Sequence, residues 1–155
     1  MYLTGPEAAE CEVLKEAEGI LQNSGLRALV VDDSTTVRRL MDLTLRPLGM
    51  DLEFADNGED AIRLAGARNY DIIFLDVLLP GIDGYRVCKA IKADKRTKNM
   101  SVIMLTSKDS TFDKVRGIMS GTDVYLTKPL DRTELLKAIS RCLPGFQLAL
   151  GMATT

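Results

Sequence analysis

The sequence contains no histidine and no tryptophan, and aromatic residues make up only 5% of its 155 residues. Without histidine, a Ser-His-Asp triad, acid–base catalysis by imidazole and most zinc sites are excluded. The three cysteines, Cys11, Cys88 and Cys142, are an odd number, lie far apart and form no CxxC pair. This pattern indicates reduced thiols in the cytoplasm, and it argues against a disulfide framework or a zinc site.

Long apolar runs and large charge imbalances are also missing. No run approaches the roughly 18 apolar residues of a membrane-spanning helix, and the acidic first residues do not resemble a signal peptide. We therefore expect a cytoplasmic protein without membrane contact. Residues 1–25 hold five acidic residues and one lysine, a net charge of −4, and the remainder holds 17 acidic and 19 basic residues, a net charge of +2. So small a basic surplus predicts no direct binding of nucleic acid.

Five short segments have the composition of β-strands. Four are runs rich in Val, Ile and Leu that are typical of strands buried on both faces of a parallel sheet, and a fifth is weaker. In chain order, with the weaker segment second, the five are residues 26–31, 51–55, 72–75, 102–105 and 124–126.

Helical patterns follow the strands. Ser34 and Asn57 are predicted to cap two helices, Asp83 to begin a third, and Gly49 to end the first. Two further apolar patterns, over residues 112–119 and 135–143, predict the last two helices. This β-α alternation predicts the α/β class, with a five-stranded parallel sheet covered by helices on both faces.

The chain is expected to divide into an N-terminal extension (1–25), one domain (26–143) and a C-terminal tail (144–155). Residues 5–22 of the extension are predicted to form an extra amphipathic helix, because Val13, Leu14, Ala17, Ile20 and Leu21 make one apolar stripe. Such a stripe is expected to dock on its own domain or to pair with a second copy in a homodimer.

Polar residues end four of the predicted strands. Asp32 and Asp33 follow the first strand, Asp76 the third, Thr106 the fourth and Lys128 the fifth. The carboxyl ends of parallel strands meet at one edge, where α/β sheets bind ligands. Three clustered carboxylates raise each other's pKa unless a cation lies among them, and Mg²⁺ suits such oxygen ligands.

This set of residues suits phosphoryl chemistry. Asp76 could attack a phosphoryl group to form an acyl phosphate, while the metal and Lys128 offset charge and the Thr106 hydroxyl donates a hydrogen bond. Each residue alone is more often a turn or cap residue. Because they occur together at the ends of four predicted strands, a site for phosphoryl chemistry is favoured over separate turn and cap residues.

Four motifs carry a resemblance to a known family. VVDDS (30–34), FLDVLLPGIDGY (74–85), VIMLTSKD (102–109) and YLTKP (125–129) resemble, in order and spacing, the receiver domain of bacterial two-component response regulators. The resemblance covers residues 26–143, and it is strongest to the stand-alone receivers of chemotaxis and type IV pilus motility systems. It implies the flavodoxin-like (βα)5 receiver fold with strand order 2-1-3-4-5.

The resemblance also implies a role for each site residue. Asp76 would be the phosphoacceptor and a metal ligand, Asp33 a direct Mg²⁺ ligand, and Asp32 an acid that holds the metal's waters. Leu78 would bind the metal through its backbone carbonyl. Thr106 and Lys128 would bind the phosphoryl group, with the Lys128–Pro129 bond expected to be cis, and Tyr125 would be the aromatic switch.

The function implied is that of a single-domain phosphoprotein in phosphorelay signal transduction. A histidine kinase would donate the phosphoryl group, and the protein would catalyse only its own phosphorylation and dephosphorylation. Because no output domain fits in the remaining residues, the signal is expected to pass to a downstream target protein by contact. Residues 110–121, 123–127 and 131–143 would form that contact surface.

Two other classes compete with this interpretation. A haloacid-dehalogenase-type phosphatase needs an acid two residues after its Asp nucleophile, and Leu78 at that position cannot transfer a proton. A flavodoxin-like FMN carrier needs an uncharged phosphate loop, where Asp32 and Asp33 would repel the phosphate. The basic residues among 86–98 are interpreted as a solvated helix face, with a docking patch for an acidic partner or for the acidic N-terminal helix as the alternative.

Overall fold

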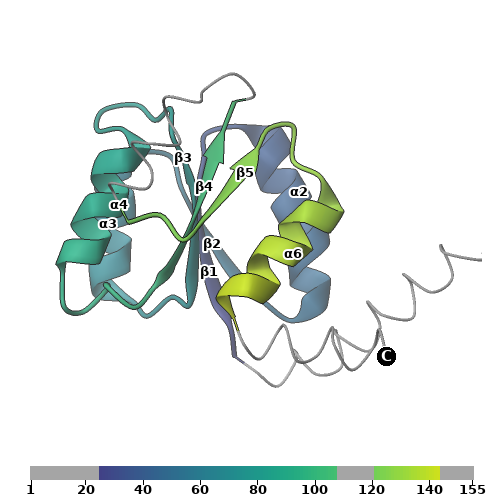
Figure 1. Ribbon diagram of the computed structural model, residues 1–155, viewed down its shortest axis with the longest axis horizontal. Helices are drawn as coiled ribbons and strands as arrows, with labels where there is room; N and C mark the ends of the chain where they lie inside the picture. Colours follow the sequence, from purple (N-terminus) through teal and green to yellow (C-terminus); the bar gives the residue numbers. More distant parts are fainter. Residues whose placement is uncertain (1–24, 108–120, 144–155) are drawn as a thin grey trace, which may run out of the picture.

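A five-stranded parallel sheet in the order β2-β1-β3-β4-β5 forms the centre of the fold (Figure 1). The computed structural model describes residues 25–107 and 121–143. The elements are β1 (Arg27–Val31), α2 (Thr35–Leu45), the 3-10 turn η1 (Arg46–Leu48), β2 (Asp51–Ala55), α3 (Gly58–Ala67), β3 (Ile72–Asp76), α4 (Gly84–Ala93), β4 (Ser101–Thr106), β5 (Val124–Thr127) and α6 (Arg132–Cys142). Helices α3 and α4 cover one face of the sheet, and α2 and α6 cover the other. The predicted α/β class and strand order are confirmed.

Local side-chain caps explain where the helices begin. The Ser34 hydroxyl accepts a hydrogen bond from Val37 N at 3.4 Å, the Asn57 side chain from Asp60 N at 2.8 Å, and Asp83 from Arg86 N at 2.9 Å. These three predicted helix starts are confirmed, because each side chain satisfies an N–H group that lacks a partner in its helix.

The first helix ends differently from the prediction. The apolar pattern continues to Leu48, but the α-helix stops at Leu45 and one 3-10 turn follows. Pro47 lacks an N–H group and cannot extend the α-helical hydrogen bonds. Gly49, which was predicted to stop the helix, instead ends this 3-10 turn, with φ of 85° in the left-handed region.

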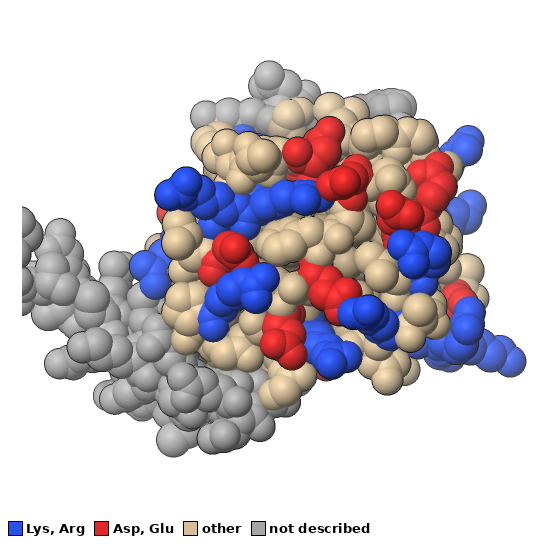
Figure 2. Space-filling view, turned by 180° about the vertical axis from the view of Figure 1, so that it is seen from behind, with Lys and Arg blue, Asp and Glu red and all other residues tan. Residues whose placement is uncertain are grey.

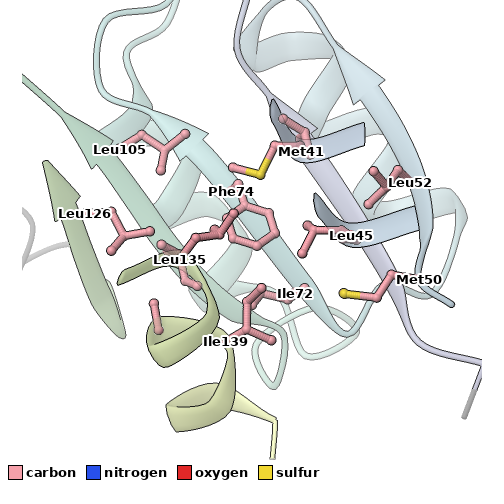
Figure 3. Packing of buried hydrophobic residues seen from close by; sticks show 14 of the residues in the cluster. Met41, Leu45, Met50, Leu52, Ile72, Phe74, Leu105, Leu126, Leu135 and Ile139 are labelled. Atoms are coloured by element: carbon pink, nitrogen blue, oxygen red, sulfur yellow. The ribbon is translucent and has the colours of Figure 1, made fainter. Parts of the chain in front are cut away.

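Strand β3 divides the core into two clusters because successive side chains point to opposite faces of a sheet. Ile72 and Phe74 pack with residues of α2 and α6, and Figure 3 shows Phe74 between Met41 and Leu135. Ile73 and Leu75 pack on the other face with residues of α3 and α4. All five residues of β3 are buried, as expected for a central strand of a parallel sheet that is covered on both faces.

The strand at residues 124–126 was expected to be buried on both faces, and this expectation was wrong. Val124 and Tyr125 are only half-buried and Leu126 alone is buried. The reason is topological, since β5 pairs with β4 on one side and is the last strand in the order of the described sheet.

Among residues 25–107 and 121–143, no helix is long and apolar enough to cross a membrane. On the face shown in Figure 2, acidic and basic side chains are interspersed. The predicted helix at 5–22 with its homodimer, the helix at 112–119 and the tail at 144–155 lie outside the described residues. The division of the chain at residues 25 and 143 remains a prediction.

Candidate functional site

The carboxyl edge of the sheet brings the predicted acidic residues together. One carboxylate oxygen from each of Asp32, Asp33 and Asp76 lies within 4.8 Å of the other two. Asp32 is fully buried, Asp76 is 6% exposed and Asp33 is exposed. They meet here because β1 and β3 are parallel neighbours, with Val31 opposite Leu75 in the register. Two buried carboxylates thus share one site with an accessible third.

Lys128 brings a positive charge to the two buried carboxylates. Its Nζ lies 2.8 Å from Asp32 Oδ2 and 3.3 Å from Asp76 Oδ2. Its backbone N–H donates to Thr106 O at 2.7 Å, so the residue after β5 is fixed to the end of β4. The Lys128–Pro129 peptide bond is cis, as expected.

The other oxygen of each buried carboxylate accepts a backbone hydrogen bond. Ser34 N donates to Asp32 Oδ1 at 2.8 Å, and Leu78 N donates to Asp76 Oδ1 at 3.2 Å. Each carboxylate is therefore oriented with one oxygen toward its own loop and the other toward Lys128. This arrangement fixes the orientation of the Asp76 carboxylate.

Burial and crowding alter the titration of the site. Burial raises the pKa of the Asp76 carboxyl, and the neighbouring Asp32 carboxylate raises it further, while Lys128 opposes both. For Lys128, burial lowers the pKa, but the contacts with Asp32 and Asp76 outweigh it and the pKa rises above its usual value. One ammonium group does not neutralise the negative charge of three carboxylates, so the site favours the binding of a further cation.

The donor set fits Mg²⁺. Hard divalent cations prefer carboxylate and carbonyl oxygens, and Mg²⁺ retains several waters when few carboxylates are available. Asp33 is exposed beside the buried pair and leaves the cluster open to solvent. The three carboxylates could hold the ion, with the Leu78 carbonyl as the backbone ligand that the resemblance implies.

Thr106 is the last residue of β4, and Tyr125 is the second residue of β5. Thr106 is 3% exposed and directly follows Leu105, which is opposite Asp76 in the register. Tyr125 is half-buried on β5 and packs against the core cluster under α3 and α4. The Tyr125 hydroxyl donates to the hydroxyl of Tyr85 at 3.2 Å, a contact that the sequence did not predict.

The loop between β3 and α4 turns at a glycine and is supported by a residue of α3. Gly81 has φ of 78°, in the left-handed region that glycine adopts without strain. Ile82 N donates to Glu59 Oε1 at 3.3 Å, so the first turn of α3 supports the loop. The Leu78 side chain, by contrast, is 75% exposed beside Asp76. Nothing in the spacing of the sequence pointed to Glu59.

Comparison with known proteins gives a consistent result. Residues 28–140 match the response regulator receiver domain family. Protein PilG of Pseudomonas aeruginosa is 43% identical over 125 residues, which cover 81% of this chain and 93% of PilG. The chemotaxis response regulator CheY4 of Vibrio cholerae has a similar structure, with a TM-score of 0.72, 32% identity, and coverage of 77% of this chain and 99% of that one.

A further solved structure bears on the metal. The receiver domain of sensor histidine kinase PA1611 from Pseudomonas aeruginosa PAO1 was determined with a magnesium ion coordinated in its active site cleft. It has a TM-score of 0.70 and 30% identity, and the match covers 76% of this chain and 97% of that one.

The fold and the acidic edge with its lysine define a signalling receiver of the α/β class. The chain belongs to the response regulator receiver domain family, as the sequence motifs indicated. It is therefore a response regulator receiver of two-component signalling, and members of this family are signalling proteins without a metabolic enzyme activity.

Proposed function

We propose that the protein accepts a phosphoryl group on Asp76 from a phosphohistidine of a histidine kinase and transmits the signal by contact with a target protein. The observation that carries this proposal is the position of Asp76, whose Oδ2 lies 3.3 Å from Lys128 Nζ within a cluster of three carboxylates. The family and the open edge of the site support it.

The transfer balances with the residues present. An Asp76 carboxylate oxygen forms a bond to phosphorus while the bond from phosphorus to the donor's imidazole nitrogen breaks, and the imidazole leaves with the electron pair. Lys128 is close enough to move from the carboxylates to the phosphoryl oxygens, and Thr106 would donate its hydroxyl to one of them. Placed beside Asp76, these two groups would stabilise negative charge on the transferred phosphoryl group.

Magnesium is part of the proposal. Asp33 and Asp76 would bind the ion directly, Asp32 would hold its waters and Leu78 would supply a backbone carbonyl. Bound there, Mg²⁺ supplies positive charge to the phosphoryl oxygens. The cluster of carboxylate oxygens and the magnesium site of the PA1611 receiver support this assignment.

The output is proposed to pass through the surface that includes residues 123–127 and 131–143. Tyr125 would report phosphorylation by changing its rotamer, which shifts the population between two states of this surface. The third part of the predicted surface, residues 110–121, lies almost wholly outside the described residues. The protein would catalyse only its own phosphorylation and dephosphorylation, in the cytoplasm, where the free thiols of Cys88 and Cys142 remain reduced.

Phosphorylation by acetyl phosphate or by a phosphohistidine donor tests the proposal. The native chain should gain one acid-stable, base-labile phosphoryl group and should require Mg²⁺. Asp76→Asn should abolish labelling, whereas Asp33→Asn should raise the Mg²⁺ concentration needed. The matched control is Asp51→Asn, whose exposed carboxyl lies at the start of β2, and it should label normally. Undiminished labelling of Asp76→Asn would contradict the assignment.

A further inference from the structure

A concentration of positive charge lies on α4 and the turn that follows it. Residues 83–99 hold six basic and two acidic residues, a net charge of +4. Residues 26–155 carry a net charge of +2, so without residues 83–99 the remainder carries −2. The basic surplus beyond the N-terminal extension is therefore gathered on one helix and its turn.

Four of these six basic side chains are exposed and have no acidic partner. Lys92 pairs with Asp123 and Arg96 pairs with Asp94. In the part of the chain that the structure describes, the other four form no ion pair. Because like charges that lie close together repel one another, an acidic segment placed among them would be attracted to all four. These four residues, the basic patch, are Arg86, Lys89, Lys95 and Lys98.

The N-terminal extension enters the fold at the same edge of the sheet as the Lys98 end of the basic patch. Asp71 N donates to Arg27 O at 2.8 Å, and Ser101 N donates to Asp71 O at 3.2 Å, so the starts of β1, β3 and β4 lie in one row. Neighbouring strands are about 4.8 Å apart, which places the start of β4 roughly 10 Å from the start of β1. Lys98 comes three residues before β4.

The extension carries the complementary charge within reach of the patch. Residues 1–25 have a net charge of −4, and all five of their acidic residues lie between Glu7 and Glu18. Glu18 is seven residues before Gly25, where the described chain begins. Seven residues span about 10 Å in a helix and up to about 25 Å when extended. Either length bridges the two strands that separate β1 from the Lys98 end of the patch.

We propose that residues 7–18 of the extension dock on the basic patch of α4 in the same chain. Their carboxylates lie beside the exposed cations, and the covalent link to β1 gives the extension a high effective concentration at the patch. While it is docked, this face of α4 is closed to an acidic segment of another protein. The inference does not depend on the role proposed for Asp76, because no residue of the patch belongs to the acidic site.

Zero-length cross-linking of the full chain tests the contact. A water-soluble carbodiimide joins a carboxylate to a lysine amine where the two touch, and mass spectrometry identifies the pair. Residues 7–18 should be joined to Lys89, Lys95 and Lys98. The yield should fall at least about threefold near 1 M NaCl, where charges are screened beyond roughly 3 Å. Lys137 is the internal control, since its side chain is 65% exposed on α6, which covers the opposite face of the sheet.

The rate at which chymotrypsin cuts the extension gives a second readout. Docking protects the extension, so cleavage after Leu14 and Leu21 follows the undocked fraction. Combining Lys89→Gln with Lys95→Gln should speed cleavage about two- to twentyfold, since one exposed ion pair is worth roughly 1.5- to fivefold. The matched control is Lys137→Gln, which removes one exposed lysine from α6 and should leave the rate unchanged.

Three outcomes would overturn the inference. Cross-links made mainly to Lys137, or cleavage of the Lys89→Gln, Lys95→Gln variant at the native rate, would show that the patch does not hold the extension. Cross-links between chains in a mixture of ¹⁴N- and ¹⁵N-labelled protein would place the extension on a second copy. Both readouts should be the same in Asp76→Asn as in the native chain, so the inference and the proposed function fail separately.

Discussion

Gly84 packs directly on the backbone of Asp76, since a Cβ atom added to Gly84 would lie only 2.2 Å from the carbonyl oxygen of Asp76. Glycine is required here for space and not for an unusual backbone conformation, because Gly84 does not have a positive φ. The close approach lets α4 begin where β3 ends. It thereby links the position of the proposed phosphoacceptor to the position of the whole helix.

Gly84→Ala is expected to lower both stability and phosphorylation. The added methyl group must displace backbone, which gives way less easily than a side chain, so the free energy of unfolding should fall by about 1–3 kcal/mol. The rate of phosphorylation should fall as well, because Asp76 is displaced. Urea unfolding and acetyl phosphate labelling measure the two effects. Gly66→Ala is the control, since its Cβ would meet Arg96 at an ordinary 3.6 Å. That variant should be neutral or more stable by about 0.5–1 kcal/mol.

Lys128→Met is expected to make stability more dependent on Mg²⁺. Without the ammonium, the Oδ2 atoms of Asp32 and Asp76 lose the cation that they share. The loss in unfolding free energy should be about 1–3 kcal/mol in metal-free buffer, less than for a wholly buried pair because the Lys128 side chain is 27% exposed. Added Mg²⁺ should raise the thermal midpoint more in the variant than in the native chain. Equal increases would show that Lys128 and the metal do not share these carboxylates.

Much of the fold could be predicted because its signals are local. The caps at Ser34, Asn57 and Asp83 depend on residues three positions away, and the buried runs mark the strands directly. The cap at Asp131 was missed, although Glu134 three residues later follows the pattern of a capping box. The convergence of Asp32, Asp76 and Lys128 was also predictable, since parallel strands place their carboxyl ends at one edge.

Contacts that depend on how α4 lies against the sheet could not be predicted. Tyr85 and Tyr125 are 40 residues apart, and only the packing of the helix brings their hydroxyls together. Lys92 was expected on a solvated face with Arg86 and Lys89, but that interpretation was wrong for Lys92. Its side chain turns toward Asp123 and donates to Met100 O at 2.8 Å, whereas Arg86 and Lys89 are exposed. A charge pattern alone does not distinguish a solvated lysine from one that joins two elements.

Tyr70 predicts how stability changes at high pH. Burial raises the pKa of its hydroxyl from 10.0 to about 12, and the carboxylate of Glu53 adds to the rise. Between these values the unfolded chain loses the proton while the folded chain retains it. The stabilisation that comes from the protonated Tyr70 hydroxyl is therefore fully present below pH 10. It is lost as the pH rises toward 12, and the free energy of unfolding falls by at most about 2–3 kcal/mol.

Urea unfolding of the native chain and of Tyr70→Phe across this range measures the effect. The native chain should lose more stability than the variant between pH 10 and 12, because phenylalanine has no proton to release. Parallel losses in the two proteins would mean that Tyr70 titrates normally and that burial of its hydroxyl has no energetic consequence.

The lifetime of the phosphorylated state is expected to depend on Leu78. Hydrolysis needs a water in line with the bond from phosphorus to Asp76, and a side chain next to the site can orient or exclude it. The Leu78 side chain is 75% exposed, while its backbone N–H binds Asp76 Oδ1. Leucine offers this water no hydrogen bond and covers its approach with apolar surface. We also expect Lys108 to slow the hydrolysis of the acyl phosphate, but this residue lies outside the described residues.

Leu78→Asn should therefore lose its phosphoryl group faster than the native chain, by roughly 3- to 30-fold, since one orienting contact is worth about 1–2 kcal/mol. The measurement is the first-order loss of phosphate from the isolated protein with Mg²⁺. Leu43→Asn is the matched control. Leu43 is 67% exposed near the end of α2, so this substitution makes the same change in polarity at a position away from Asp76. It should leave the rate unchanged. If Leu78→Asn hydrolyses at the native rate or more slowly, the attacking water is positioned by another group, and Leu78 contributes only its backbone to the site.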